Sequence, residues 1–374
     1  MRSILLVWAS LWAILSFLFL PFTFVFLPPI GIALSTLILP INQWICSGFG
    51  VDIQNTFLIS DSLAMYATAF LLLVFSGIVS AGMGFRFKAK IVQIQQILFL
   101  ILLVLLAYFL IRYGLDKLFN RQFYTPASNT LHTPTGQLSK DILFWTSMGT
   151  SSFYNAFMGI AEVLTGILLL IHRTRFLGLI VAFGILANIF AINIGFDITV
   201  KYLSGLLLLT SVICLSFYDA RLKSLITGKF VEKETPKFNK TLILILFMPF
   251  LVDLAMTYWE NPKNESGQSY EIVSVSSKSE LLPVNEIVRI HLHPSGYFIV
   301  ENKKQVFVSY RMSPDRKFVI VNRRMIPIVL KGNLLIWEEG GSEIRCELKW
   351  IELEAMPLKQ DKMHWYFEGI EGVN

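Results

Sequence analysis

Long apolar runs fill the larger, N-terminal part of this sequence, and they constrain its fold more than any other feature. The chain has 374 residues, of which 54% are hydrophobic, and its mean hydropathy is +0.60. In a helix, about 20 apolar residues cross a hydrocarbon core of about 30 Å, and several runs reach that length. The sequence therefore predicts an integral membrane protein whose first partner is the lipid bilayer.

We expect about seven membrane-spanning helices. Their segments are residues 3–27, 61–85, 91–112, 153–171, 176–194, 200–217 and 241–259. Within the N-terminal transmembrane region, 1–90, residues 28–49 have a short apolar core that ends at Pro40. We interpret them as a re-entrant or interfacial segment, with a full span as the alternative. Residues 91–218 form the membrane core, and a basic linker, 219–240, leads to the last span.

Basic residues between the spans predict how the chain is oriented. Three groups fall on one side under this count of spans: Arg86 to Lys90, Arg173 with Arg175, and the linker 219–240. Loops rich in Lys and Arg stay in the cytoplasm. We therefore expect a bacterial inner-membrane protein with a cytoplasmic N-terminus and residues 264–374 in the periplasm or outside. The net charge of +6 follows from these loops and does not indicate a nucleic-acid partner.

Polar and small residues on two successive spans indicate a buried site. Asn155, Gly159, Glu162 and Gly166 share one helical face, and Asn188 lies on a similar face of the next span. At about 1.5 Å per residue, Glu162 and Asn188 both fall near the bilayer midplane. We expect Glu162 to face Asn188 and to be protonated or paired, with Lys201 as a candidate cation. The pair then serves either as a helix-packing hydrogen bond or as a ligand or proton site.

Further polar residues gather at the outer ends of the spans. The candidates for a polar well open to the outside are Arg112, Lys117, Asn193, Asp197, Lys201 and Asp253, together with Asn155, Glu162 and Asn188. Asp197 and Lys201 are four residues apart and close enough to pair. The alternative is that Arg112 and Lys117 are ordinary interfacial anchors, and that Asp253 caps backbone freed by Pro249.

The residue pattern of 264–374 is typical of a separate all-β domain. Apolar Val288, Ile290 and Leu292 alternate with polar residues, as in a half-buried strand. Similar runs are 297–300, 306–310, 318–321, 326–330, 334–337, 344–353 and 364–367, separated by turn residues. The expected fold is thus a membrane all-α bundle followed by a small antiparallel all-β barrel or sandwich.

The sequence contains little evidence for a metal site or a reactive thiol centre. His291 and His293 lie on the polar face of their strand, and we expect them to be solvated rather than metal ligands. Cys46, Cys214 and Cys346 have no CxxC spacing that would predict a dithiol centre or a zinc site.

Several of these residues together resemble the DoxX family of bacterial membrane proteins. The resemblance covers about residues 91–217 and rests on Tyr113-Gly114-x-x-Lys117, Gln122-Phe123, Gly159-x-x-Glu162-x-x-x-Gly166, Arg173, Asn188 and Asp197-x-x-x-Lys201. It implies a four-helix core, and a place among subunits of membrane redox complexes, some of which act on quinone. It supplies no catalytic residues. The C-terminal part, with its late Leu348-x-Trp350 strand, is loosely similar to lipocalin-like domains.

Three functions are consistent with these patterns. The first is a membrane component of a redox or quinone-linked system, with quinone as the ligand and other redox subunits as partners. The second is a non-enzymatic protein that binds a lipid or a hydrophobic small molecule. The third is a small-solute transporter, which is disfavoured because the sequence has no matching halves with paired broken helices. Whether the protein is an enzyme does not follow from the sequence.

Overall fold

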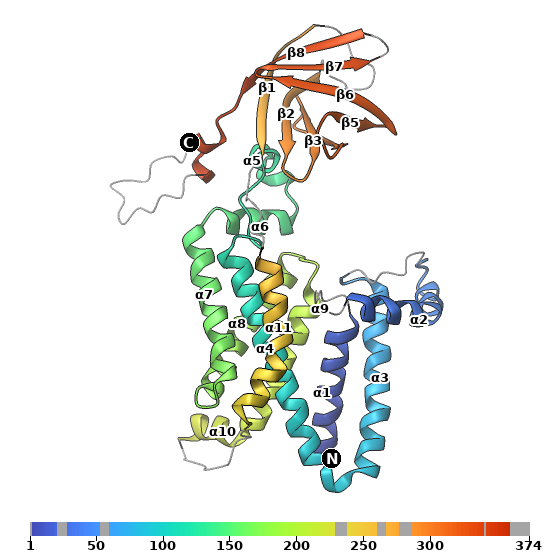
Figure 1. Ribbon diagram of the computed structural model, residues 1–374, viewed down its shortest axis with the longest axis vertical. Helices are drawn as coiled ribbons and strands as arrows, with labels where there is room; N and C mark the ends of the chain where they lie inside the picture. Colours follow the sequence, from blue (N-terminus) through green and yellow to red (C-terminus); the bar gives the residue numbers. More distant parts are fainter. Residues whose placement is uncertain are drawn as a thin grey trace, which may run out of the picture. The chain divides into compact units, whose positions relative to one another are not determined.

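The computed structural model describes residues 2–20, 28–52, 60–228, 238–259, 267–276, 286–339 and 342–359 (Figure 1). The chain divides into two compact units. The helical unit comprises Met1–Phe119 and Phe157–Asn261, and the barrel unit comprises Asn120–Ala156 and Pro262–Asn374. Each unit is therefore assembled from two separate stretches of the chain.

The helical unit confirms a multi-pass membrane protein. Its helices are α1 (Arg2–Phe19), α2 (Pro28–Ser47), α3 (Leu63–Arg86), α4 (Ile91–Leu118), α7 (Ser152–Leu170), α8 (Arg175–Gly195), α9 (Lys201–Leu215), α10 (Asp219–Thr227) and α11 (Lys240–Tyr258), with short 3₁₀ turns at Lys88–Lys90 and Ser216–Tyr218. Among the described residues, six helical segments are long and apolar enough to cross a membrane, and Ser3–Phe19 forms a shorter apolar helix. Residues 28–47 form one helix that contains Pro40.

α4 lies at the centre of the helical unit. In its most apolar window 72% of the residues are buried, more than in any other candidate span. Its residues 97–111 are apolar on every side, which suits a helix surrounded by other helices and lipid. α4 contacts α1, α9 and α11 along its length.

Glycine brings α4 and α7 into backbone contact. A Cβ added to Gly114 would lie 2.7 Å from the carbonyl oxygen of Gly159, and one added to Gly159 would lie 2.7 Å from that of Gly114. A Cβ on Gly166 would meet the carbonyl oxygen of Ala107 at 2.8 Å. Such close approach is possible only where side chains are absent. The small face of α7 therefore contacts α4, and not α8 as the sequence suggested.

The barrel unit contains a closed antiparallel barrel of eight strands in sequence order. They are β1 (Gln268–Val275), β2 (Ile287–His293), β3 (Tyr297–Asn302), β4 (Phe307–Met312), β5 (Phe318–Val321), β6 (Arg324–Lys331), β7 (Leu334–Glu339) and β8 (Ser342–Trp350). β1 pairs with β8, with Tyr270 opposite Trp350, which closes the barrel. Of the two predicted arrangements, the barrel is therefore confirmed and the sandwich is not formed. The predicted strand 364–367 lies outside the described residues.

Residues 120–156 belong to the barrel unit, and their first helix packs against two strands of the barrel. These residues form α5 (Ser128–His132), a 3₁₀ turn (Thr135–Gln137) and α6 (Lys140–Gly149). α5 contacts β1 and β2, and the hydroxyl of Ser128 donates to the carbonyl oxygen of Gln268. The ring of His132 lies 5.1 Å from that of His291.

This cover corrects the expectation that His291 is solvated, because its exposed fraction is 0%. Its Nδ1 lies 2.7 Å from the hydroxyl of Ser269, and its Nε2 lies 3.3 Å from a carboxylate oxygen of Glu301. Arg289 donates two hydrogen bonds to the same carboxylate. Burial, with His132 and Arg289 nearby, lowers the pKa of His291 to about 3. The neutral ring satisfies both neighbours if Nδ1 accepts from Ser269 and Nε2 donates to Glu301. His293, also expected on the solvated face, is half-buried, and burial lowers its pKa as well.

The glycine contact predicts a large packing effect. Gly159→Val should lower the thermal stability of the helical unit, by about 1–3 kcal/mol or more, because the added methyl groups force two backbones apart. Gly184→Val is the matched control, since nothing lies within 4 Å of a Cβ at Gly184. Thermal unfolding of both variants in detergent tests this, and equal losses would contradict it.

The burial of His291 predicts an acid-sensitive barrel. Its pKa is lower in the folded protein than the ordinary value of 6.5. Its contribution to stability is therefore complete above pH 6.5 and is lost as the pH falls toward 3, at about 1.4 kcal/mol per pH unit. Hydrogen exchange of β1 to β3 as a function of pH measures this loss. His291→Gln should flatten the profile in that window, and an unchanged profile would assign the acid sensitivity to other groups.

Candidate functional site

The last three turns of α4 carry polar and charged side chains that pair with groups on two neighbouring helices. Tyr108, Arg112 and Asp116 follow at steps of four, so they share one helical face. Tyr113 and Lys117 follow the same spacing on a neighbouring face. α4 therefore presents polar groups in two directions, one toward α11 and the other toward α7.

The first of these faces holds Asp253 of α11. The phenol of Tyr108 donates to Oδ2 of Asp253 at 2.5 Å, and the guanidinium of Arg112 lies 3.4 Å from the same oxygen. Arg112 also donates to the phenol oxygen at 2.7 Å. Asp253 is buried, so its charge is balanced inside the bundle rather than by water. Tyr108, Arg112 and Asp253 are called the α11 triad below.

A second contact fixes α11 one turn further along. The phenol of Tyr258 donates to a carboxylate oxygen of Asp116 at 2.6 Å and to the carbonyl oxygen of Arg112 at 2.9 Å. Because Tyr108, Arg112 and Asp116 all take part, the α4 and α11 helices are held in one register by hydrogen bonds.

The other face holds Glu162 of α7. Nζ of Lys117 lies 2.8 Å from Oε2 of Glu162, and the side chains are 5% and 4% exposed. Gly114 and Gly159, each three residues before one member of the pair, bring the two backbones together. The close packing thus places two charged side chains within bonding distance in a region that excludes water. Taking one partner away would leave the other charge buried and unbalanced, at a cost of about 3–5 kcal/mol.

Glu162 meets neither of the two partners that the sequence suggested, Asn188 and Lys201. Asn188 is exposed and Lys201 pairs elsewhere. α8 buries the face that carries Gly178, Ala182, Leu186 and Asn193, and this rotation turns Asn188 outward. Helical spacing predicted that Glu162 and Asn188 lie on polar faces, but it did not determine which helix each face meets.

The remaining candidates lie apart from these two clusters. Nζ of Lys201 lies 2.7 Å from Oδ1 of Asp197, which confirms the predicted pair, although the Asp197 side chain is 80% exposed. Asn193 is buried in α8. Asn155 belongs to the barrel unit, where its amide donates to the carbonyl oxygen of Met148 and its Oδ1 is buried without a partner among the described residues.

Sequence reasoning missed Tyr108, Asp116, Tyr258 and Asp61. Tyr108 and Asp116 could have been found by extending the four-residue spacing from Arg112 in both directions along α4, whereas Tyr258 lies five residues after Asp253 and does not follow that spacing. The Asp61 carboxylate accepts from the backbone N–H groups of Lys201 and Tyr202, at 2.8 and 3.0 Å, and so caps the N-terminus of α9. No spacing rule connects residues so distant in sequence.

The chemistry available is that of ion pairs and phenols. Among the described residues no group of three His, Cys, Asp or Glu side chains could hold a metal ion. Cys46, Cys214 and Cys346 are free thiols and buried. Arg175, expected as a cytoplasmic anchor, is fully buried, with its Nε donating to the carbonyl oxygen of Leu169. The α11 triad and the Lys117–Glu162 pair therefore bring hydrogen-bond donors and acceptors together inside the helical unit.

These observations define the class as a multi-pass membrane protein with a closed β-barrel domain. No family model matches the chain, and no solved structure matches it. The sequence is 44% identical over 71 residues to "Uncharacterized protein YwoB" of Bacillus subtilis (strain 168). That match covers 19% of this chain and 46% of the relative, so the chain spans about half of the relative's length.

Proposed function

We propose that the helical unit is the membrane component of a redox or quinone-linked system. The observation that carries the proposal is the α11 triad, in which a phenol, a carboxylate and a guanidinium meet inside a membrane helix bundle. Ionisable groups at such positions are costly, and they commonly mark proton or substrate paths. The resemblance of residues 91–217 to DoxX proteins supports the same function, with other membrane redox subunits as partners.

The chemistry of quinones explains why these groups suit that role. Reduction of a quinone to a quinol takes up two electrons and two protons, so protons must reach the ring oxygens inside the membrane. A phenol bonded to a carboxylate can pass a proton, and the neighbouring guanidinium donates a further hydrogen bond to the phenol oxygen. Lys117 and Glu162 offer a second donor and acceptor on the adjacent face of α4. Electrons come from a partner subunit in this proposal.

Binding of a short-chain quinone tests the proposal. The full chain in lipid nanodiscs should bind decylubiquinone saturably. Tyr108→Phe should weaken binding about tenfold, because the phenol can no longer exchange its hydrogen bond to Asp253 for one to a ring oxygen. Tyr66→Phe, which removes an exposed phenol of α3, is the matched control. Absence of saturable binding to the unaltered protein would refute the quinone role.

A double substitution separates function from packing at the second cluster. Glu162→Gln alone should destabilise the bundle, since Lys117 would remain charged and buried. Lys117→Met combined with Glu162→Leu should regain the lost stability, because well-packed apolar side chains replace a buried pair at little or no cost. We expect this double variant to melt like the original protein yet bind decylubiquinone more weakly. Full binding by the double variant would restrict the pair to a packing role.

We also propose a bacterial inner-membrane location with a cytoplasmic N-terminus and an extracytoplasmic segment 264–374. The support is that Arg86, Lys88, Lys90, Arg173, Arg221 and Lys223 are all exposed. Buried Arg175 no longer counts toward that charge. Alkaline phosphatase fused after Asn374 should be active, and fusion of the same enzyme at Gly228 should be inactive, because it folds only outside the cytoplasm. The reverse pattern would overturn the orientation.

A further inference from the structure

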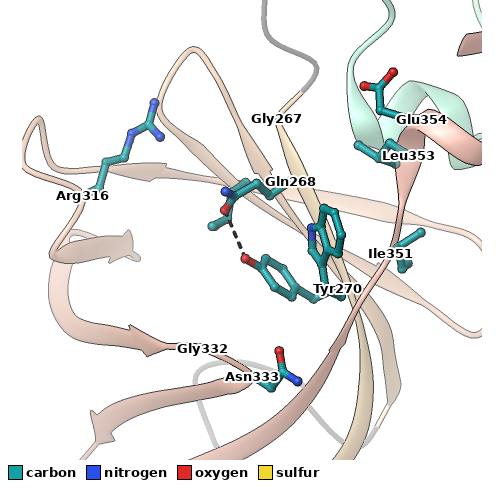
Figure 2. A pocket seen from close by; sticks show the side chains of 11 residues that line it. Gly267, Gln268, Tyr270, Arg316, Gly332, Asn333, Ile351, Leu353 and Glu354 are labelled. Carbon is teal, nitrogen blue, oxygen red and sulfur yellow. Dashed lines mark hydrogen bonds between the residues drawn. The ribbon is translucent and has the colours of Figure 1, made fainter.

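One end of the barrel carries a pocket of about 660 Å³ (Figure 2). It is lined by the start of β1, the β4–β5 and β6–β7 turns, the end of β8 and the 3₁₀ helix Leu353–Ala355. Deeper in the barrel, Val319, Trp337 and Cys346 are buried and fill the interior. The space open to a ligand is therefore at the end of the barrel and not at its centre. The volume lies within the range of about 300–1,000 Å³ that is usual for small-molecule sites.

The pocket has an apolar wall. Tyr270 and Leu353 are buried, whereas the side chain of Trp350 is 57% exposed. An indole that is still open to solvent at the edge of a pocket offers a flat apolar surface, and covering it with a ligand is favourable. Leu292 and Ile351 extend the same wall. This half of the pocket suits a hydrocarbon chain or ring.

The pocket also offers hydrogen-bond donors. The phenol of Tyr270 donates to Oε1 of Gln268 at 3.1 Å, the dashed line in Figure 2. Because the amide oxygen of Gln268 accepts this bond, its NH₂ group is the part that can donate to a ligand. Arg316 donates one N–H to the carbonyl oxygen of Pro294 at 3.2 Å, and a guanidinium has five such donors.

The charge at the pocket favours an anion. Figure 2 shows Arg316 and Glu354 on opposite sides. The carboxylate of Glu354 lies 3.2 Å from Nζ of Lys359, so a cation accompanies it. The carboxylate of Asp315, next to Arg316, accepts hydrogen bonds from Ser313 and from the N–H of Lys317 within its own turn. The guanidinium of Arg316 is therefore the charged donor that a ligand meets at this end of the barrel.

The backbone of Arg316 is also unusual. Its φ is +57°, a left-handed conformation that glycine or asparagine adopts more easily than arginine. The N–H of Arg316 donates to the carbonyl oxygen of Ser313 at 2.8 Å, which fixes the turn. A long cationic side chain is thus held at a position where the backbone alone would favour another residue.

We infer that this end of the barrel binds an anionic amphiphile, with its carboxylate or phosphate group at Arg316 and its apolar part against Tyr270 and Trp350. The inference concerns the barrel unit and is independent of the quinone-linked role of the helical unit. It involves binding only, and no covalent step.

Equilibrium dialysis of the full chain in lipid nanodiscs tests the inference, with empty nanodiscs as the blank. The probes are octanoate, octyl phosphate and the neutral analogue octanol. We expect both acids to bind saturably, and octanol to bind about tenfold more weakly, because it lacks the charge-assisted hydrogen bonds to Arg316. A preference for octyl phosphate would indicate a lipid-like phosphate as the natural group, and a preference for octanoate would indicate a fatty acid. Either preference supports the inference.

Substitutions assign the binding to this pocket. Arg316→Gln should weaken binding of both acids about tenfold and leave octanol unchanged. Arg323→Gln is the matched control, since Arg323 also lies in a barrel turn with φ of +66° but does not line the pocket. Trp350→Ala should weaken all three probes. The inference is overturned if octanol binds as well as octanoate, if the two arginine variants behave alike, or if no probe binds above the blank.

Discussion

The contact between α4 and α7 at Gly114 and Gly159 is the constraint on which the helical unit depends. Two helices can come this close only where neither has a side chain at the crossing. Lys117 and Glu162 then meet one turn away, in a region that water does not reach. The neighbouring face of α4 is held to α11 by the α11 triad. Packing and charge are therefore not separate features of this bundle, because the close packing determines which charges pair.

The two units protect buried polar groups in different ways. In the helical unit the buried carboxylates of Glu162 and Asp253 each lie beside a cationic side chain of α4. In the barrel unit the buried histidine stays neutral, and Arg289 supplies the charge for Glu301. The helical clusters are thus ion pairs, whereas the barrel contains a buried neutral imidazole that is expected to cost stability in acid. α5 is responsible for that difference, since it covers His291 against solvent.

The sequence predicted the helices and strands better than it predicted which of them pack together. Apolar runs predicted the long helices because a membrane leaves the backbone no other partner than itself. Alternation predicted β2 to β8, but β1 was missed. It has polar residues such as Gln268 and Glu271, and an irregularity between Ile272 and Ser274 breaks the period. The pairing of Lys117 with Glu162 was not predicted, because helical spacing defines a face and not its partner. The sequence also did not predict that residues 120–156 belong to the barrel unit, because the strands of that unit come much later in the chain.

That last feature has a consequence for how the protein is made. Ser128 of α5 and Gln268 of β1 are 140 residues apart in sequence. At a synthesis rate of about 5–20 residues per second, α5 leaves the ribosome roughly 7–28 s before the strand it covers. During that interval four apolar helices must enter the bilayer while α5 has no barrel to bind. The barrel unit is thus completed late, and its first segment depends on the membrane insertion of the helices that separate it from the rest.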